Sequence, residues 1–181
     1  MNDGNLIVRL AASGVDLNSR NHQGITAVHA AAFRENIDAL DVLLNLGADP
    51  NLGNQLNYTP LMAACTNRKA KAVKLLLKQG ADPNAGDVEG QTALISVFAT
   101  SGPDYETQIP VAQALLDAGA EINCTDACGA TPLMHAAWFG SLIGVQWLIQ
   151  HGATVGARDK AGRTAKDIAI AKEFYEIAIL L

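Results

Sequence analysis

The chain has 181 residues, of which 49% are hydrophobic and 17% are charged, and its net charge is -5. This composition is too apolar for an intrinsically disordered chain, and no apolar run reaches the roughly 18 residues that a membrane-spanning helix requires. The negative charge opposes attraction to a nucleic acid backbone, so we expect a folded protein with no nucleic acid or membrane partner.

Two residue types recur with one period along the chain. Threonine and glycine series each show intervals of 33, 33, 39 and 33 residues. Two independent series that share one period and one interruption predict a stack of repeated structural units. The threonines are Thr26, Thr59, Thr92, Thr131 and Thr164, and the glycines are Gly14, Gly47, Gly80, Gly119 and Gly152.

The units follow from these landmarks in chain order. Residues 1–20 are expected to form a partial unit that lacks the first helix, with Leu6 to Ala12 as its second helix. Full repeats are expected at 21–53, 54–86, 87–125 and 126–158, and a C-terminal capping unit at 159–181. In each repeat the threonine is a good helix N-cap. A second helix with apolar residues at helical spacing then ends at glycine. The capping unit has charged residues in place of apolar ones, as expected where a stack meets solvent.

The residues after the threonines identify the kind of repeat. Thr26-Ala27-Val28-His29-Ala30-Ala31, Thr59-Pro60-Leu61-Met62-Ala63-Ala64 and Thr131-Pro132-Leu133-Met134-His135-Ala136 resemble the ankyrin repeat over nearly the whole chain. The resemblance implies an all-α, single-domain solenoid of stacked helix-turn-helix units with projecting β-hairpin-like fingers. It also implies a structural hydrogen bond between His29 and the Thr26 hydroxyl.

The third full repeat departs from the pattern in two ways. It contains six extra residues between its helices, within Ser101–Thr107, and Tyr105 is a candidate exposed anchor. The insertion is either neutral or a contact for a partner. In addition, Val97 and Phe98 replace the usual alanine pair. They either spread the adjacent helices or are accommodated by a locally compensated core.

The sequence contains none of the motifs that we sought for catalysis. His-Glu-x-x-His, the phosphate-binding loop, Gly-x-Ser-x-Gly and the dinucleotide fingerprint are all absent. Cys124, Cys128 and His135 suggest zinc only weakly because no fourth ligand is evident. The recurring Asp87, Asp126 and Asp159 indicate turn geometry rather than paired catalytic carboxylates. We therefore expect a non-enzymatic protein with no cofactor and no metal.

The resemblance implies that a partner binds in the groove between the fingers and the first helices. Its variable positions, with the insertion, give thirteen candidate contact residues. The group of His135, Trp138 and Phe139 is the best single anchor, unless these rings pack against adjacent repeats. The candidates are His22, Ile25, Phe33, Arg34, Tyr58, Asn67, Glu89, Tyr105, His135, Trp138, Phe139, Lys160 and Arg163.

The expected function is that of an adaptor or inhibitor, monomeric when unbound, that binds another protein of unknown identity in its groove. Basic residues on or beside the groove, Arg34 and Arg163 among them, favour an acidic partner. One alternative is a small phosphorylated ligand on Trp138 and Phe139, with Arg34 or Lys160 as the phosphate ligand. Another is a structural fragment of a larger ankyrin-containing protein.

The cellular compartment follows only from general features of the chain. No signal peptide is visible at Met1-Asn2-Asp3-Gly4. Three cysteines, an odd number, do not make a disulfide framework. The cytoplasm is therefore the default location, with a removed signal peptide as the alternative.

Overall fold

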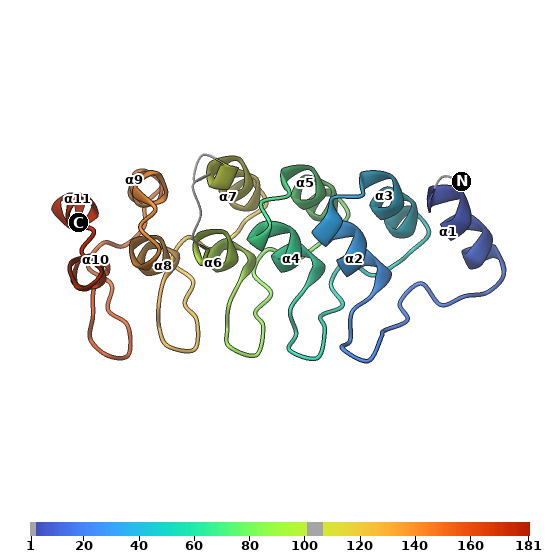
Figure 1. The fold of residues 1–181 in the computed structure, drawn as a ribbon, viewed down its shortest axis with the longest axis horizontal. Coiled ribbons are helices and arrows are strands. Elements are labelled where there is room, and N and C mark those ends of the chain that lie inside the picture. The colour runs from blue at the N-terminus through green and yellow to red at the C-terminus, as the bar shows by residue number, and fades with distance from the viewer. Residues whose placement is uncertain (1–2, 101–106) are drawn as a thin grey trace.

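A computed structural model describes residues 3–100 and 107–181. Within these ranges the structure contains helices and no strand, which confirms the expected all-α solenoid. The helices form two rows that run along the molecule (Figure 1). The first row contains α2 (Ala27–Arg34), α4 (Pro60–Thr66), α6 (Ala93–Phe98), α8 (Pro132–Trp138) and α10 (Ala165–Ala171). The second row contains α1 (Asp3–Ala12), α3 (Ile37–Asn45), α5 (Ala70–Lys78), α7 (Gln108–Asp117), α9 (Leu142–Gln150) and α11 (Tyr175–Leu180).

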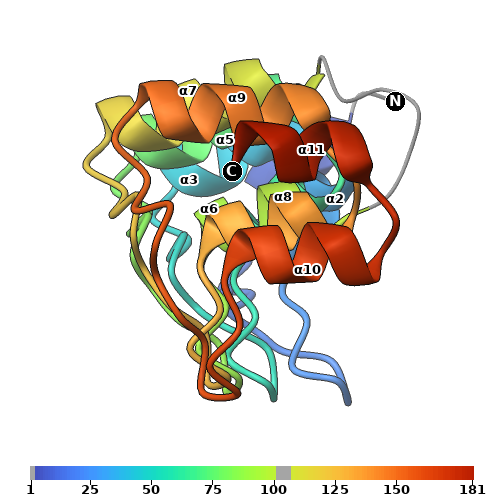
Figure 2. The same ribbon diagram turned by 90° about the vertical axis from the view of Figure 1, so that its left-hand side faces the viewer.

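Five fingers project from the first row, on the side away from the second row (Figures 1 and 2). Each finger turn is closed by one side chain whose Oδ1 accepts hydrogen bonds from the backbone two and four residues later. This confirms that the recurring acids maintain turn geometry. The residues are Asn21, Asn54, Asp87, Asp126 and Asp159.

Single backbone hydrogen bonds join adjacent fingers. The amide of Val88 donates to the carbonyl of Leu56 at 3.0 Å, and the amide of Ala127 donates to Glu89 at 2.7 Å. Equivalent bonds run from Gln55 to Gln23 at 3.3 Å and from Lys160 to Cys128 at 2.9 Å. The fingers therefore form a connected row rather than independent loops.

The His29 ring connects the first full repeat to the second. Its Nδ1 accepts from the Thr26 amide at 3.2 Å and lies 2.9 Å from the Thr26 hydroxyl, so the implied hydrogen bond is confirmed. Because Nδ1 accepts an N–H, the proton of the neutral ring is on Nε2, which donates to the Tyr58 carbonyl at 2.9 Å. Burial lowers the pKa of His29 below its ordinary value of 6.5 despite that bond.

Asparagines after the second helices form a further set of links between repeats. Asn51 accepts from the Asp82 amide at 2.8 Å and donates to the Gly80 carbonyl at 3.0 Å. Asn84 makes the same pair of bonds, to Glu121 and Gly119, one repeat later. Each asparagine therefore satisfies backbone groups of the following repeat.

The large side chains of the third repeat are accommodated by a compensated core. Val97 and Phe98 are fully buried. The Phe98 ring lies where a side chain on Gly144 of α9 would be, and its centroid is 6.3 Å from that of Trp147. A glycine in the next repeat thus provides space for the ring. Tyr105 and residues 101–106 lie outside the described residues.

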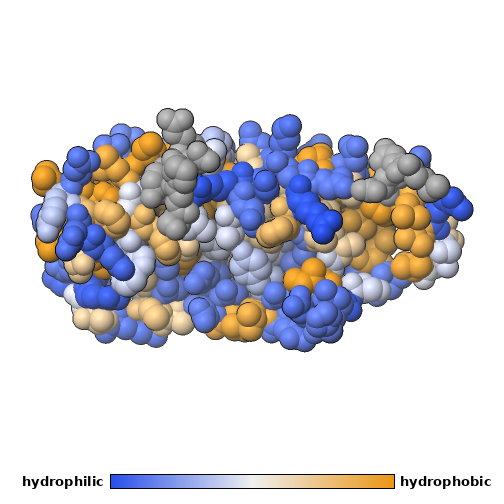
Figure 3. Space-filling view, viewed as in Figure 1, coloured by the Kyte–Doolittle hydropathy of each residue, from blue (hydrophilic) through white to orange (hydrophobic). Residues whose placement is uncertain are grey.

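Both ends of the stack expose hydrophobic side chains, but their helices are paired differently. At the N-terminal end α1 packs against α3, and the described residues that precede α2 form no first-row helix to pair with α1. Leu6 is 48% and Leu10 42% exposed, whereas the equivalent Ala39 and Leu43 of α3 are buried. Figure 3 shows the resulting hydrophobic surface over α1. At the C-terminal end α10 packs against α8 and α11. It exposes the charged residues Lys166 and Asp167, but Ile170 is also 49% exposed and Ile179 of α11 is 82% exposed. The exact unit boundaries stay a prediction.

Candidate functional site

The candidate site is the concave face formed by the first-row helices and the fingers. Two of the proposed aromatic anchors are exposed on it: Phe33 at the end of α2 is 53% exposed, and Trp138 at the end of α8 is 41% exposed. Both side chains are accessible because they follow the small residues that pack the first row, Ala31-Ala32 and Ala136-Ala137, which are buried. Neither ring is buried between neighbouring repeats.

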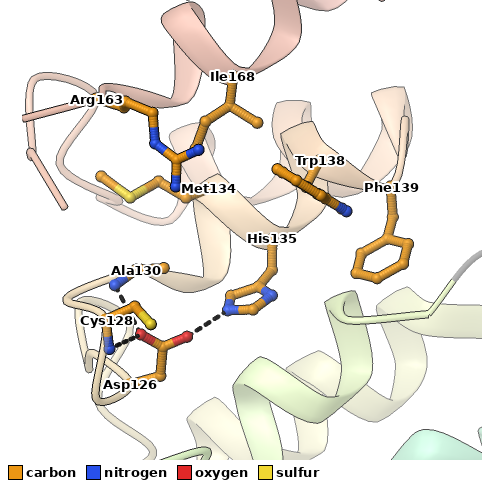
Figure 4. Close-up of a pocket in the computed structure, with 9 residues that line it drawn as sticks. All are labelled: Asp126, Cys128, Ala130, Met134, His135, Trp138, Phe139, Arg163 and Ile168. Carbon is orange, nitrogen blue, oxygen red and sulfur yellow. Dashed lines mark hydrogen bonds and ion pairs between the residues drawn. The ribbon is translucent and has the colours of Figure 1, made fainter. Parts of the chain in front are cut away.

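One hollow on this face, which we call the C-terminal hollow, has a volume of about 230 Å³ and is shown in Figure 4. Buried Met134 and Ile168 form an apolar floor, and Trp138 forms one wall. The structure brings four candidates together here, His135, Trp138, Phe139 and Arg163. The full lining is Asp126, Cys128, Ala130, Met134, His135, Trp138, Phe139, Arg163 and Ile168.

The basic side chains in the C-terminal hollow are already paired. His135 Nε2 donates to Asp126 Oδ2 at 2.9 Å. Arg163 Nε donates to Asp159 Oδ2 at 2.8 Å, and Arg163 Nη2 forms an ion pair with the same oxygen at 2.7 Å. Burial of Asp159 acts to raise its pKa, but the hydrogen bonds and charge from Arg163 lower it overall. The expectation of a basic groove is therefore wrong at Arg163, whose charge is matched by a buried carboxylate.

Lys172 of the capping unit covers part of the Trp138 ring. Its Nζ lies 3.7 Å from the ring centroid, which is a cation–π contact. The exposed 41% of Trp138 is what remains accessible with this lysine in place.

A second hollow, the N-terminal hollow, lies between the first and second full repeats and has a volume of about 490 Å³. It brings together Ile25, Phe33, Arg34 and Tyr58. Within residues 3–100 and 107–181, the Arg34 guanidinium makes no hydrogen bond or ion pair. The full lining is Gln23, Ile25, His29, Ala30, Phe33, Arg34, Asn54, Tyr58 and Ala63.

Tyr58 is a fixed wall of the N-terminal hollow rather than a mobile anchor. Its hydroxyl donates to the Met62 carbonyl at 3.2 Å and also lies in hydrogen-bond contact with the Thr66 hydroxyl. Burial raises the pKa of this phenol, although the Thr66 contact opposes the rise. The ring is partly buried and presents its apolar face to the hollow.

Among the described residues, four of the predicted contact residues line neither hollow. His22, Glu89 and Lys160 are exposed on the fingers. Asn67 donates to the Ala63 carbonyl at 2.8 Å and so helps to end α4. These residues border the concave face between and beside the hollows.

Sequence reasoning missed several lining residues, notably Met134, Ile168 and Ala63, because they occupy positions assigned to packing. The zinc interpretation gains no support: Cys124 Sγ lies 3.2 Å from the Thr92 hydroxyl. The described part of the chain contains no group of three or more possible metal-binding side chains. No helix in residues 3–100 or 107–181 is long and apolar enough to span a membrane.

Models of two repeat families match the chain. The model for three copies of the ankyrin repeat matches residues 1–87 and 30–107, and the model for many copies matches residues 105–149. Repeats of this kind generally act as protein–protein interaction modules.

Similar proteins include the Caenorhabditis elegans ankyrin repeat and LEM domain-containing protein 1 homolog, 41% identical over 63 residues, or 35% of this chain and 9% of that protein. Mouse ankyrin repeat domain-containing protein 37 is 39% identical over 66 residues, or 36% of this chain and 42% of that protein. Rat Arf-GAP with coiled-coil, ANK repeat and PH domain-containing protein 2 is 41% identical over 61 residues, or 33% of this chain and 8% of that protein. The chain thus matches less than half the length of each of these relatives.

Proposed function

The chain belongs to the ankyrin repeat family, and we propose that it is a non-catalytic module that binds a partner protein in its concave groove, as an adaptor or inhibitor. The observation that carries this proposal is the exposure of Phe33 and Trp138, each in its own hollow on one continuous face. Aromatic side chains in such positions dominate interface energies, and loss of one typically costs about 2 kcal/mol or more.

The rigidity of the face also supports the proposal. The fingers are joined by backbone hydrogen bonds, and Tyr58 is held by its hydroxyl. A preformed surface loses little conformational entropy when a partner binds, so more of the contact energy appears as affinity. We further propose that the unbound protein is a cytoplasmic monomer.

The alternative of a small phosphorylated ligand has weaker support. The expected combination of Arg34 with Trp138 and Phe139 is wrong, because Arg34 ends α2, whereas the two rings lie at the C-terminal end of α8, with α4 and α6 between them (Figure 1). In the C-terminal hollow, Arg163 already forms an ion pair with Asp159. Lys160 remains as the phosphate ligand of that hypothesis. The alternative of a structural fragment of a longer protein stays a prediction.

Capture from a native lysate by immobilised wild-type protein and by Phe33→Ala and Trp138→Ala variants tests the proposal. A matched control is Ile143→Ala, since Ile143 is 38% exposed on α9, in the row away from the groove. We expect the same protein to be captured by wild type and control and to be reduced at least tenfold by the groove variants, which corresponds to about 1.4 kcal/mol. Equal capture by all four proteins would refute the assignment of the groove.

A further inference from the structure

The N-terminal and C-terminal hollows are the same structural site in the first and fourth full repeats. Phe33 and Trp138 each stand seven residues after the threonine that starts their helix. Ile25 and Ala130 likewise each stand one residue before it. The far walls also correspond, because Tyr58 and Arg163 occupy one position in the fingers of the following units. The protein therefore presents one kind of hollow twice, at the two ends of its groove.

The repeats between them do not offer the same anchors. The positions equivalent to Phe33 and Trp138 hold Thr66 and Ala99. Thr66 is hydrogen-bonded to the Tyr58 hydroxyl, and the neighbouring Thr100 accepts from Arg68 Nη2 at 3.1 Å. Small side chains whose hydroxyls are already bonded thus separate two aromatic sites.

The two hollows differ in available charge. Arg34 lines the N-terminal hollow with no ion pair or side-chain hydrogen bond in the described part of the chain, beside the amide side chains of Gln23 and Asn54. In the C-terminal hollow, Arg163 and His135 are each paired with an aspartate. The Lys172 ammonium at its edge is held over the Trp138 ring in a cation–π contact. A carboxylate is therefore favoured at the first hollow, and an uncharged apolar group at the second.

From this arrangement we propose that the groove binds one extended segment of a partner protein through two anchors. An aromatic residue next to a carboxylate occupies the N-terminal hollow, and an uncharged aromatic or aliphatic residue occupies the C-terminal hollow. This inference rests on the proposed function and specifies the chemistry of its partner. The part of the segment between the anchors passes over Thr66 and Ala99.

The spacing of the anchors follows from the stack. The hollows are three repeats apart, and neighbouring packed helices lie about 8–10 Å apart, which gives roughly 24–30 Å. An extended chain advances about 3.3 Å per residue, so the anchors are about eight residues apart. An even number of residues places both side chains on the same side of an extended segment, as two hollows on one face require.

Connection of the two anchors makes each hollow dependent on the other. Once one anchor is bound, the second is held at a high effective concentration, so two weak sites together bind more tightly by a factor of about 100 or more. Loss of either hollow should therefore reduce affinity for a two-anchor segment to that of a single-anchor segment. The order of the anchors along the segment sets its direction in the groove.

Synthetic peptides provide the test. Each peptide contains Asp-Phe and a second Phe at an offset of about four, eight or twelve residues, in both orders. The spacers are rich in threonine, because β-branched residues favour the extended backbone that advances about 3.3 Å per residue. Dissociation constants are measured by fluorescence anisotropy against folded wild-type protein. We expect the tightest binding at an offset of about eight, by tenfold or more over the shortest peptide, and loss of this advantage in both Phe33→Ala and Trp138→Ala.

Further variants test the preference for a carboxylate separately from any effect on the folded structure. Arg34→Gln should weaken peptides that carry aspartate about tenfold and leave the Asn-Phe versions unchanged, and Ile143→Ala should leave every affinity unchanged. Affinity that is independent of offset, binding of no peptide, or tightest binding at an offset of four would overturn the proposal. Partner capture that still depends on Phe33 and Trp138 would then show that the groove functions by another mode of recognition.

Discussion

Replacement of Gly144 with alanine tests how the structure accommodates the bulky third repeat. A Cβ at this position would lie 2.6 Å from Ser141 Oγ, and 2.9 and 3.0 Å from two carbons of the Phe98 ring. Both contacts are too close, and neither neighbour can move freely. Phe98 is fully buried, and the Ser141 hydroxyl donates to Gln108 at 2.7 Å while accepting the Gly144 amide at 3.1 Å.

The net effect is the balance of two opposing contributions. Overpacking of a core typically costs about 1–3 kcal/mol, and displacement of the Ser141 cap adds up to about 1 kcal/mol. Alanine stabilises a helix relative to glycine by at most about 1 kcal/mol, which offsets part of these costs. We therefore expect Gly144→Ala to lower the free energy of unfolding by about 1–2 kcal/mol.

Urea denaturation followed by circular dichroism measures this change, and a double-mutant cycle identifies its cause. Phe98→Leu should relieve most of the cost of Gly144→Ala, because the smaller side chain vacates the space that the new methyl group enters, giving a coupling energy of about 1 kcal/mol. Gly156→Ala is the control, since a Cβ there meets nothing within 4 Å. Equal or greater stability of Gly144→Ala, or purely additive effects in the cycle, would refute the packing argument.

Three further predictions follow from the structure. Because the pKa of His29 is lowered in the folded state, the unfolded state takes up its proton first as the pH falls. The free energy of unfolding, measured by urea titrations, should therefore decrease as the pH falls below about 6.5, and His29→Gln should flatten that slope. Asn84→Ala removes two bonds to the next repeat and should cost about 1–2 kcal/mol in the same assay, whereas loss of less than a few tenths would show that water replaces them. A thiol reagent should modify exposed Cys128 in the native protein. It should modify Cys65 only on unfolding, because Cys65 is fully buried and its pKa is raised by burial; modification of Cys65 first, detected by mass spectrometry of digests, would contradict this.

The periodic features of the fold could be predicted from the sequence because each acts within its own repeat. Threonine caps, terminal glycines and finger aspartates bond to backbone a few residues away, so a short window contains both partners. The links between repeats could not be predicted in this way. Asn51 bonds to Asp82, 31 residues later, and the glycine that accommodates Phe98 is Gly144. Only the stacked structure brings such residues together.

The candidate site was partly predictable for the same reason. The exposed rings Phe33 and Trp138 stand at variable positions of single repeats, and these positions can be identified in sequence. Each hollow, however, takes its far wall from the next unit, as Tyr58 and Arg163 show. The pairing of Arg163 with Asp159 spans only four residues, and its spacing could have shown that this cation is not free.

Because α1 has no first-row helix to pair with, the two ends of the described stack should differ in stability. In a linear array each unit is held only by its neighbours, so opening should begin at α1, which packs against α3 without a first-row helix of its own, and spread inward. The repeat next to that end carries the N-terminal hollow, while the repeat with the C-terminal hollow is enclosed by α9 and the capping unit. A partner bound in both hollows would link the least stable end of the protein to its more enclosed part. Binding should therefore slow local opening at the N-terminal end.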